Sequence, residues 1–369
     1  MAVIVIQKAP ETMGARERVR RTFQYEPTDR VPIGYEDNPG IHKKVCAMLG
    51  VSPEDQLGLS RALGVDYLPL DIPYVGPQVY PEIPGRLRIP ETGAVVRYVE
   101  NAFGAYYDFC DFPLADADDE ALDAYPFPSP DDYDYEAGAA RLRYLHQEGF
   151  AVHMGNAGWG DILNSTGTLM GVEEALVRMA TEDPATLAMI DRRLAMQLGI
   201  LERILDRVGR EIDFLWTGED LGSQNAPLIS QALYDRVLKP RHQQFIDLAH
   251  SYHIPVIMHT CGASSWVYET LIQMGMDGVD TLQPEAKDME PASLVRRFGG
   301  RLNFRGCIST AGPLANGTAD EVTAVCRETL TIMKSCRGYH FAPTHQIQDN
   351  TPPENVIAMY QAAHDFGRY

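Results

Sequence analysis

The chain has 369 residues, of which 45% are hydrophobic and 22% are charged. These proportions are ordinary for a folded globular enzyme, and they exclude a disordered chain. The formal net charge of −19 would repel a nucleic-acid backbone and an anionic membrane surface, so we expect neither as a partner.

The sequence also indicates the cellular compartment. Its basic N-terminal residues follow the short apolar run rather than precede it, which is not the order of a secretory signal. No segment comes near the roughly 18 uninterrupted apolar residues that a membrane helix needs. The six cysteines have no framework spacing, so we expect free thiols. Together these features predict a cytoplasmic protein.

Eight short apolar runs have the character of buried strands, and most are followed by a segment with helical periodicity. The predicted strands are residues 31–35, 66–73, 150–155, 213–218, 254–259, 278–284, 302–306 and 339–343. The alternation predicts a parallel sheet with helices outside it. Eight strands in a chain of this length suit an α/β fold of the (β/α)8 TIM-barrel type, with residues 1–369 as one domain.

Three helix boundaries are predicted from capping residues. Thr318 and Thr351 are each followed three residues later by glutamate, the capping-box pattern that opens a helix. Pro184 is expected to break or restart a long helical stretch over residues 171–209.

Residues 74–137 interrupt the alternation of strands and helices. They are rich in Pro, Gly, Tyr and Asp, and their pattern predicts antiparallel hairpins rather than a crossover helix. We therefore expect an insertion after the second strand. Because the active site of such a barrel lies at the C-terminal ends of its strands, the insertion is predicted to form a lid or wall over the mouth.

Polar residues that follow the predicted strands should converge on the barrel mouth. The candidates for substrate contact are Asp71, Asn156, Gln283 and Arg305. Glu219 and Asp220 follow the fourth strand within TGEDLG, whose glycines indicate tight turns. They could be carboxylates directed into the site, or an acidic pair on a loop in contact with solvent.

The clearest metal-binding pattern is His259-Thr-Cys261 at the end of the fifth strand. Residues two apart in an extended segment project to the same side, so imidazole and thiolate would form half of a zinc site. A third ligand must come from another strand end. His345 is the best candidate, and Glu219 and Cys307 are the alternatives. The competing interpretation is a core histidine beside an inert thiol.

Several segments, in this order, resemble the uroporphyrinogen decarboxylase superfamily. They are ARERVRRTFQYEPTDRVPI, TGEDLGSQNAPLISQALYDRVLKPRHQQF, PVIMHTCG, GMDGVDTLQP, FRGCISTAGPLANGT and GYHFAPTHQIQDNTPPENVIAMY. The resemblance spans nearly the whole chain and implies a single (β/α)8 barrel. The superfamily includes the haem-pathway decarboxylase and cobalamin-dependent methyltransferases, so the resemblance implies the fold more directly than the reaction.

The chain departs from the decarboxylase pattern near its N-terminus. In the decarboxylase, the Asp-Arg-x-Pro motif precedes an arginine-containing segment that grips substrate carboxylates. Here Asp29-Arg30-Val-Pro32 is followed by IGYEDNPGIHKK, without that arginine motif. Glu36 and Asp37 would repel a polycarboxylate, which argues against the decarboxylase branch.

The methyltransferase branch is the better match. Its zinc site uses His-x-Cys at the end of strand 5 and a cysteine after strand 8. His259 and Cys261 match the first two ligands, whereas His345 stands where the relatives carry the cysteine. Replacing a thiolate with an imidazole makes the metal a stronger Lewis acid.

The resemblance therefore predicts a zinc-dependent methyltransferase that moves a methyl group between a small substrate and a corrinoid protein. A methoxylated aromatic compound is the expected substrate class, because the histidine-rich site suits an ether oxygen. Glu219 would be a fourth ligand or a proton carrier, and Asp220 would orient the ligands. Tyr106, with Tyr107 and Phe109, would provide a stacking wall, although ordinary packing also fits these residues.

The alternative is a decarboxylase acting on a carboxylated small molecule. In that reading Asp71 or Asp37 is the acid and Arg305 holds the anion. Zinc at about one per chain is expected from the first hypothesis and not from the second.

Overall fold

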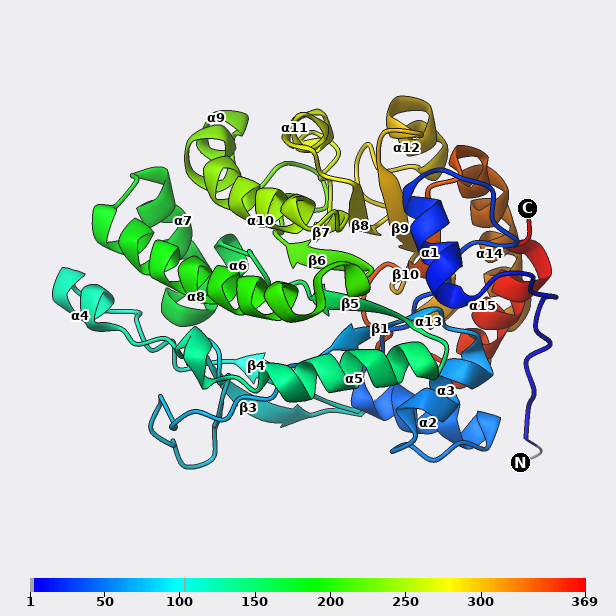
Figure 1. Ribbon diagram of the computed structural model, residues 1–369, viewed down its shortest axis with the longest axis horizontal. Coiled ribbons are helices and arrows are strands. Elements are labelled where there is room, and N and C mark those ends of the chain that lie inside the picture. Colours follow the sequence, from blue (N-terminus) through cyan, green and yellow to red (C-terminus); the bar gives the residue numbers. More distant parts are fainter. Residues whose placement is uncertain (1–2, 103) are drawn as a thin grey trace.

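The computed structural model describes residues 3–102 and 104–369. Within these residues, seven parallel strands form one curled sheet, in the order β1-β5-β6-β7-β8-β9-β10, and helices lie around its outside (Figure 1). The strands are β1 (Tyr67–Leu70), β5 (Ala151–Gly155), β6 (Phe214–Gly218), β7 (Val256–His259), β8 (Gly278–Leu282), β9 (Asn303–Ile308) and β10 (Tyr339–Pro343). The predicted α/β architecture with a parallel sheet is confirmed.

The described helices lie mostly between successive strands, along the outer side of the sheet, as the alternating pattern predicts. They are α1 (Ala15–Phe23), α2 (Pro39–Leu49), α3 (Gln56–Leu63), α4 (Asp119–Ala124), α5 (Tyr135–Gln147), α6 (Leu163–Met170), α7 (Val172–Ala180), α8 (Pro184–Val208), α9 (Gln231–Leu233), α10 (Lys239–Ser251), α11 (Tyr268–Met274), α12 (Pro291–Phe298), α13 (Pro313–Asn316), α14 (Ala319–Met333) and α15 (Pro353–Phe366). Among the described residues, no helix combines the length and the apolar character that crossing a membrane takes.

The first predicted strand, residues 31–35, does not form a regular strand. Only Ile33 makes a bridge, which is parallel to Phe341 in β10. Pro32 has no N–H to donate to a sheet ladder. The segment still contacts both edges of the sheet, because the Gly34 amide donates to the Phe341 carbonyl at 2.8 Å and the Ile33 carbonyl accepts from Asp66 N at 2.8 Å. It thus lies where an eighth strand is expected.

Residues 74–137 contain the antiparallel pairing that their pattern predicts. The strands β2 (Leu87–Arg88), β3 (Val95–Glu100) and β4 (Ala105–Phe109) form a separate three-stranded sheet. The Ala105 amide donates to Asp349 Oδ2 at 3.2 Å, and Asp349 lies in the loop that follows β10. One end of this sheet therefore contacts the C-terminal side of the large sheet, while the role of a lid stays a prediction.

The predicted helix boundaries have different outcomes. Thr318 forms the expected capping box at the start of α14, and Pro184 begins α8 after a break behind α7. The capping box predicted at Thr351 is wrong. Helix α15 begins at Pro353 with no side-chain cap, because Pro352 and Pro353 set the start through their fixed φ angles.

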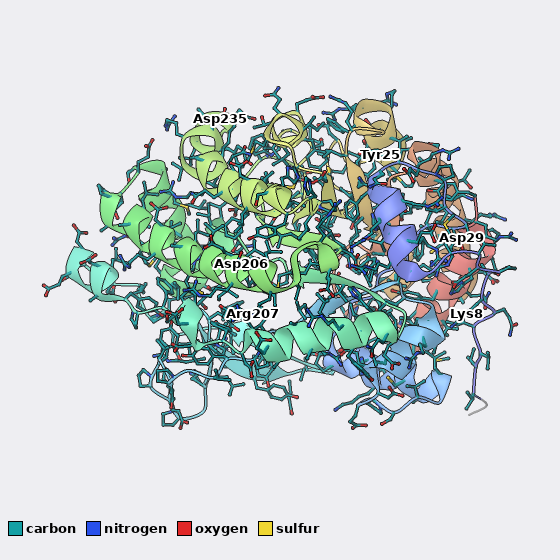
Figure 2. The ribbon with its side chains drawn as sticks, in the orientation of Figure 1. Lys8, Tyr25, Asp29, Asp206, Arg207 and Asp235 are labelled. Carbon is teal, nitrogen blue, oxygen red and sulfur yellow. The ribbon has the colours of Figure 1, made fainter. Side chains whose placement is uncertain are left out.

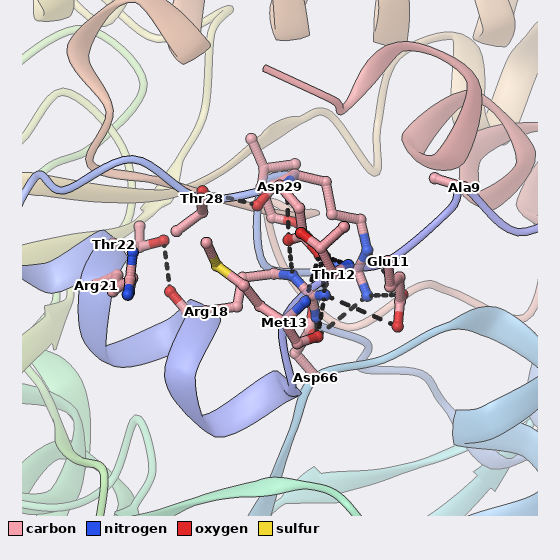
Figure 3. A network of polar contacts seen from close by, with 12 residues as sticks. Ala9, Glu11, Thr12, Met13, Arg18, Arg21, Thr22, Thr28, Asp29 and Asp66 are labelled. Atoms are coloured by element: carbon pink, nitrogen blue, oxygen red, sulfur yellow. Dashed lines mark hydrogen bonds and ion pairs between the residues drawn. The ribbon is translucent and has the colours of Figure 1, made fainter.

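A buried ion network closes the N-terminal end of the sheet (Figure 3). Asp66, which precedes β1, accepts from Arg18 Nη1 at 2.5 Å and from Arg30 Nη1 at 2.6 Å. Arg18 Nε also donates to Asp29 Oδ1 at 2.7 Å. The Ile33 amide donates to Asp66 Oδ2 at 2.7 Å. Asp29 and Arg30 of the recognised motif thus anchor the segment that replaces the first strand.

Aromatic side chains fill the inside of the sheet. Phe23 of α1 contacts Phe214 of β6 with a ring-centroid distance of 5.5 Å, and Tyr67 and Trp216 belong to the same buried cluster. Charged residues lie on the outer helices: Arg207 of α8 reaches toward α5 (Figure 2). Helix α1 therefore plugs one end of the sheet interior, and the opposite end remains for a site.

Candidate metal centre and adjoining cavity

Three side chains that are far apart in the sequence meet at the C-terminal edge of the sheet. His259 is the last residue of β7, Cys261 follows two residues later, and His345 follows β10. Each offers one ligand atom, and these atoms lie within 4.8 Å of one another. His259 is buried, Cys261 is half-buried and His345 is exposed, so the group opens toward solvent on one side.

The His259 ring is held from behind by two residues of β8. Its Nδ1 lies 2.6 Å from Thr281 Oγ1 and 3.2 Å from Asp280 Oδ2, and its Nε2 lies 3.4 Å from Cys261 Sγ. Although burial opposes the charged form, Asp280 and Cys261 raise the pKa of His259 well above its usual value. Thr281 has φ = 61°, a strained conformation for a β-branched residue.

Backbone contacts hold the Cys261 loop. Asp220 Oδ1 accepts from the Cys261 amide at 3.0 Å and lies 3.8 Å from His259 Nε2. The Gly262 amide donates to Gln283 Oε1 at 2.6 Å. Gly262 has φ = 69°, and a Cβ there would lie 2.2 Å from the Gly222 carbonyl oxygen. Only glycine therefore fits this approach of the loops after β6 and β7.

Asp220 remains a carboxylate in this setting. Burial alone would raise its pKa, but His259 and the Cys261 amide lower the pKa below the usual range. Its second oxygen accepts from Asn164 Nδ2 at 2.7 Å. The structure thus places Asp220 beside the group, where it positions Cys261.

Glu219, an alternative third ligand, lies outside the group. Its carboxylate is fully buried and accepts from the Ile162 and Leu163 amides at 2.8 and 3.0 Å, at the start of α6. Its Oε2 also lies 3.2 Å from His242 Nε2. Burial raises the pKa of Glu219 to about 8. In this conformation Glu219 supports α6 and does not face Cys261.

Cys307, the other alternative, also lies elsewhere. It is buried and lines a separate cavity with residues of the α13 and α14 region. Burial raises the pKa of its thiol. Of the three candidates for a third ligand, the structure brings His345 to the group.

A cavity of about 570 Å³ opens beside the group, within the usual size range for small-molecule sites. Three predicted substrate residues line it: Asp71, Asn156 and Arg305. Gln283 instead supports the Cys261 loop. Tyr106 is exposed on β4 and lines a small hollow with Asn38 and Asp349, so it is not a wall of this cavity.

The cavity lies next to the group, although none of His259, Cys261 and His345 lines it. Trp216 of β6 lines the cavity, and its ring centroid lies 6.4 Å from that of His259. Gln346 also lines the cavity and is the next residue after His345. A bound molecule in the cavity would therefore lie close to the His259 side of the group.

Arg305 is fully engaged by neighbouring residues. Its Nε donates to the Tyr67 hydroxyl at 2.9 Å, its Nη1 donates to Asp280 Oδ1 at 2.7 Å, and its Nη2 contacts Glu36. Burial alone would raise the pKa of Asp280, but Arg305 and His259 keep that pKa below its usual value. Arg305 thus links the cavity floor to the residues that hold His259.

The sequence pattern did not single out Asp280, Thr281, Trp216 or His153. Asp280 and Thr281 lie inside the predicted strand GVDTLQP, whereas residues after a strand end, such as Gln283, are the ones expected at a barrel mouth. An acidic residue within an apolar strand is itself unusual, because a buried carboxylate needs a partner. This feature of the sequence points to Asp280.

Comparisons with known proteins agree with this geometry. Residues 219–366 match the family model of uroporphyrinogen decarboxylase (URO-D). A uroporphyrinogen decarboxylase from Legionella pneumophila (strain Corby) is 25% identical over 264 residues, which is 69% of each chain. The predicted resemblance to the uroporphyrinogen decarboxylase superfamily is confirmed. The matched segment includes all three residues of the group, whereas Asp71 and Asn156 lie before it.

A solved structure from the same comparison shares the fold. It is a methyltransferase from Methanosarcina mazei, with a TM-score of 0.65 and 17% identity, covering 96% of this chain and 99% of that one. The shared fold therefore extends over nearly the whole chain, including the N-terminal part outside the family match.

Proposed function

We propose that the chain is a zinc-dependent methyltransferase that moves a methyl group between a small methoxylated aromatic compound and a corrinoid protein. The observation that carries this proposal is the convergence of His259, Cys261 and His345 beside a cavity of small-molecule size. Two imidazoles and one thiol are donors that zinc accepts, and three protein ligands leave one position for a substrate atom. The donor set therefore fits a catalytic zinc.

The surrounding residues suit the support of such a centre. Asp280 and Thr281 engage His259 Nδ1, which leaves Nε2 as the ligand atom and fixes the ring orientation. Asp220 holds the Cys261 backbone. When bound, zinc would supply a Lewis acid that polarises an oxygen of the substrate.

The cavity suits an aromatic substrate. Trp159, Trp216 and Tyr133 line it together with Met154 and Met196, and such aromatic and thioether groups pack favourably against an aryl ring. In the proposed demethylation the bond between the methyl carbon and the ether oxygen breaks. The oxygen keeps the electron pair and takes a proton, and the methyl group passes to the reduced cobalt of the partner corrinoid.

The relative that shares the fold across the whole chain supports this choice, since it is a methyltransferase. The family match and the Legionella relative favour the alternative, a decarboxylase acting on a carboxylated small molecule. That alternative needs Arg305 to hold a carboxylate. Arg305 already bonds to Asp280 and Glu36, so we favour methyl transfer.

The test is a pair of measurements on the purified chain. We expect about one zinc per chain by metal analysis, and methylcobalamin formation from 2-methoxyphenol and cob(I)alamin. Cys261→Ala should lose both zinc and activity, whereas Cys336→Ala, a matched change of a thiol outside the group, should keep both. Decarboxylation of uroporphyrinogen that survives chelation and Cys261→Ala would overturn the proposal.

A further inference from the structure

The cavity beside the candidate metal centre has an acidic wall. Glu36, Asp37, Asp71 and Glu91 line it. Glu36 is paired with Arg305, and Asp37 Oδ2 lies 3.0 Å from His42 Nδ1. Asp71 and Glu91 form no ion pair among the described residues, and both are exposed. The positive charge of Arg141 attracts the Asp71 carboxylate, but the two side chains are too far apart to form an ion pair.

The same wall offers no spare cation. Arg305, His42 and His153 are the basic residues among the described residues that line it. Each guanidinium nitrogen of Arg305 already has a partner: Tyr67, Asp280 or Glu36. A carboxylate entering the cavity would meet two acids that have no ion pair, and none of these lining side chains offers it a free positive charge. Such like-charge contact opposes binding.

Two polar side chains of the cavity lining carry no charge. They are Trp216 and His153, and both are at least nine-tenths buried. Their ring nitrogens Trp216 Nε1 and His153 Nδ1 have no hydrogen-bond partner among the described residues. A buried indole N–H without a partner is uncommon, since leaving such a group unpaired costs stability. Both nitrogen atoms are covered by surrounding protein atoms, so neither faces the open space of the cavity.

The ring nitrogens of His153 and Trp216 carry no charge at physiological pH. Burial, with the nearby charge of Arg305, lowers the pKa of His153 to about 3, and indole carries no charge. The Arg305 guanidinium lies 4.4 Å from the Trp216 ring centroid, so it packs against the indole face rather than extending into the cavity.

We propose that this cavity selects an uncharged methoxyarene and rejects its carboxylated analogue, with Asp71 and Glu91 as specificity residues. The inference rests on the proposed methyltransferase function and narrows its substrate class. Phenolic and ether oxygens are uncharged acceptors at neutral pH, and the aromatic walls accept the ring. A benzoate carries the charge that the wall opposes.

The inference is tested by calorimetric binding of 2-methoxyphenol and 4-hydroxy-3-methoxybenzoate to the purified chain at pH 7. We expect the benzoate to bind at least about tenfold more weakly. The double variant Asp71→Asn/Glu91→Gln should bring the two affinities within about threefold. The matched double variant Asp116→Asn/Glu173→Gln removes the same charge outside the cavity and should keep the wild-type ratio.

The result that would overturn the inference is equal binding of the two compounds by the wild-type chain, or binding of neither. An equal shift in both double variants would also overturn it, because the preference would then come from net charge rather than from Asp71 and Glu91. The measurement needs no corrinoid. Selective binding without methyl transfer to cob(I)alamin would refute only the proposed function, and methyl transfer from the benzoate at equal efficiency would refute only this inference.

Discussion

Each end of the parallel sheet carries a cluster of polar side chains, and the two clusters are used in opposite ways. At the N-terminal end, Asp66 is enclosed by Arg18 and Arg30, and every contact stays within the chain (Figure 3). At the C-terminal end, His259, Cys261 and His345 approach one another with ligand atoms that face a common point. One end is saturated by its own side chains, and the other leaves bonding capacity for something bound.

This difference shows how one scaffold separates stability from function. The N-terminal network anchors residues 29–33 against the sheet, and Val19 and Phe23 of α1 fill the interior above it. With that end closed, the strands hold the opposite loops in place. The C-terminal ends of the strands and the loops that follow them can then carry strained or exposed groups such as Thr281 and His345 without loss of the fold.

The largest effect is expected from breaking the saturated end. Asp66→Ala leaves two buried guanidinium groups without their carboxylate, and such a loss costs about 3 to 5 kcal/mol of unfolding free energy. Urea unfolding of the metal-free chain measures it. Glu17→Ala, in the exposed pair with Arg21, is the control and should change stability by less than about 0.5 kcal/mol. Equal effects of the two variants would mean that the network is not a structural anchor.

The next effect concerns the open end. Asp280→Asn weakens the contact that orients His259 and should reduce zinc affinity by about 10- to 100-fold, or about 1.4 to 2.8 kcal/mol. Chelator competition on the folded protein measures the affinity. Thr281→Val removes only the hydroxyl that contacts His259 and should give a smaller loss of the same sign. Unchanged zinc affinity in both variants would contradict the positioning role of β8.

The smallest effect is a dependence on pH at the closed end. His250 Nε2 lies 2.8 Å from Asp277 Oδ2, and this hydrogen bond raises the pKa of His250 above 6.5. A raised pKa in the folded state stabilises the protein at pH below 6.5, and this stabilisation is lost as pH rises through the folded pKa. Because the pair is partly exposed, it contributes about 0.5 kcal/mol.

His250→Gln should therefore lower the unfolding free energy at pH 5.5 and leave it nearly unchanged at pH 9, as measured by urea unfolding at both values. Gln243→Ala, on the same helix α10, should show no such pH dependence. A difference for His250→Gln that grows toward high pH would have the wrong sign for this ion pair.

Much of the architecture could be predicted from local sequence. Seven of the eight expected strands form, because a run such as IPVIMH is apolar throughout and suits a strand buried on both faces. The capping box at Thr318 also forms, since it depends on residues within one helical turn. The capping box predicted at Thr351 does not form, because two prolines set the start of the helix. The first predicted strand does not form a regular strand, because Pro32 has no N–H to donate to the sheet.

The sequence by itself determined the parallel α/β fold and the pairing of His259 with Cys261, because strand periodicity and a two-residue spacing are local properties. Only the tertiary structure decided which third residue joins them. It brought His345 across from β10, turned Glu219 toward α6 and buried Cys307 elsewhere. It also decided that Arg305 is engaged by Asp280 and Glu36. These outcomes depend on how strands far apart in sequence meet at one edge of the sheet, and no local pattern specifies the directions of their side chains.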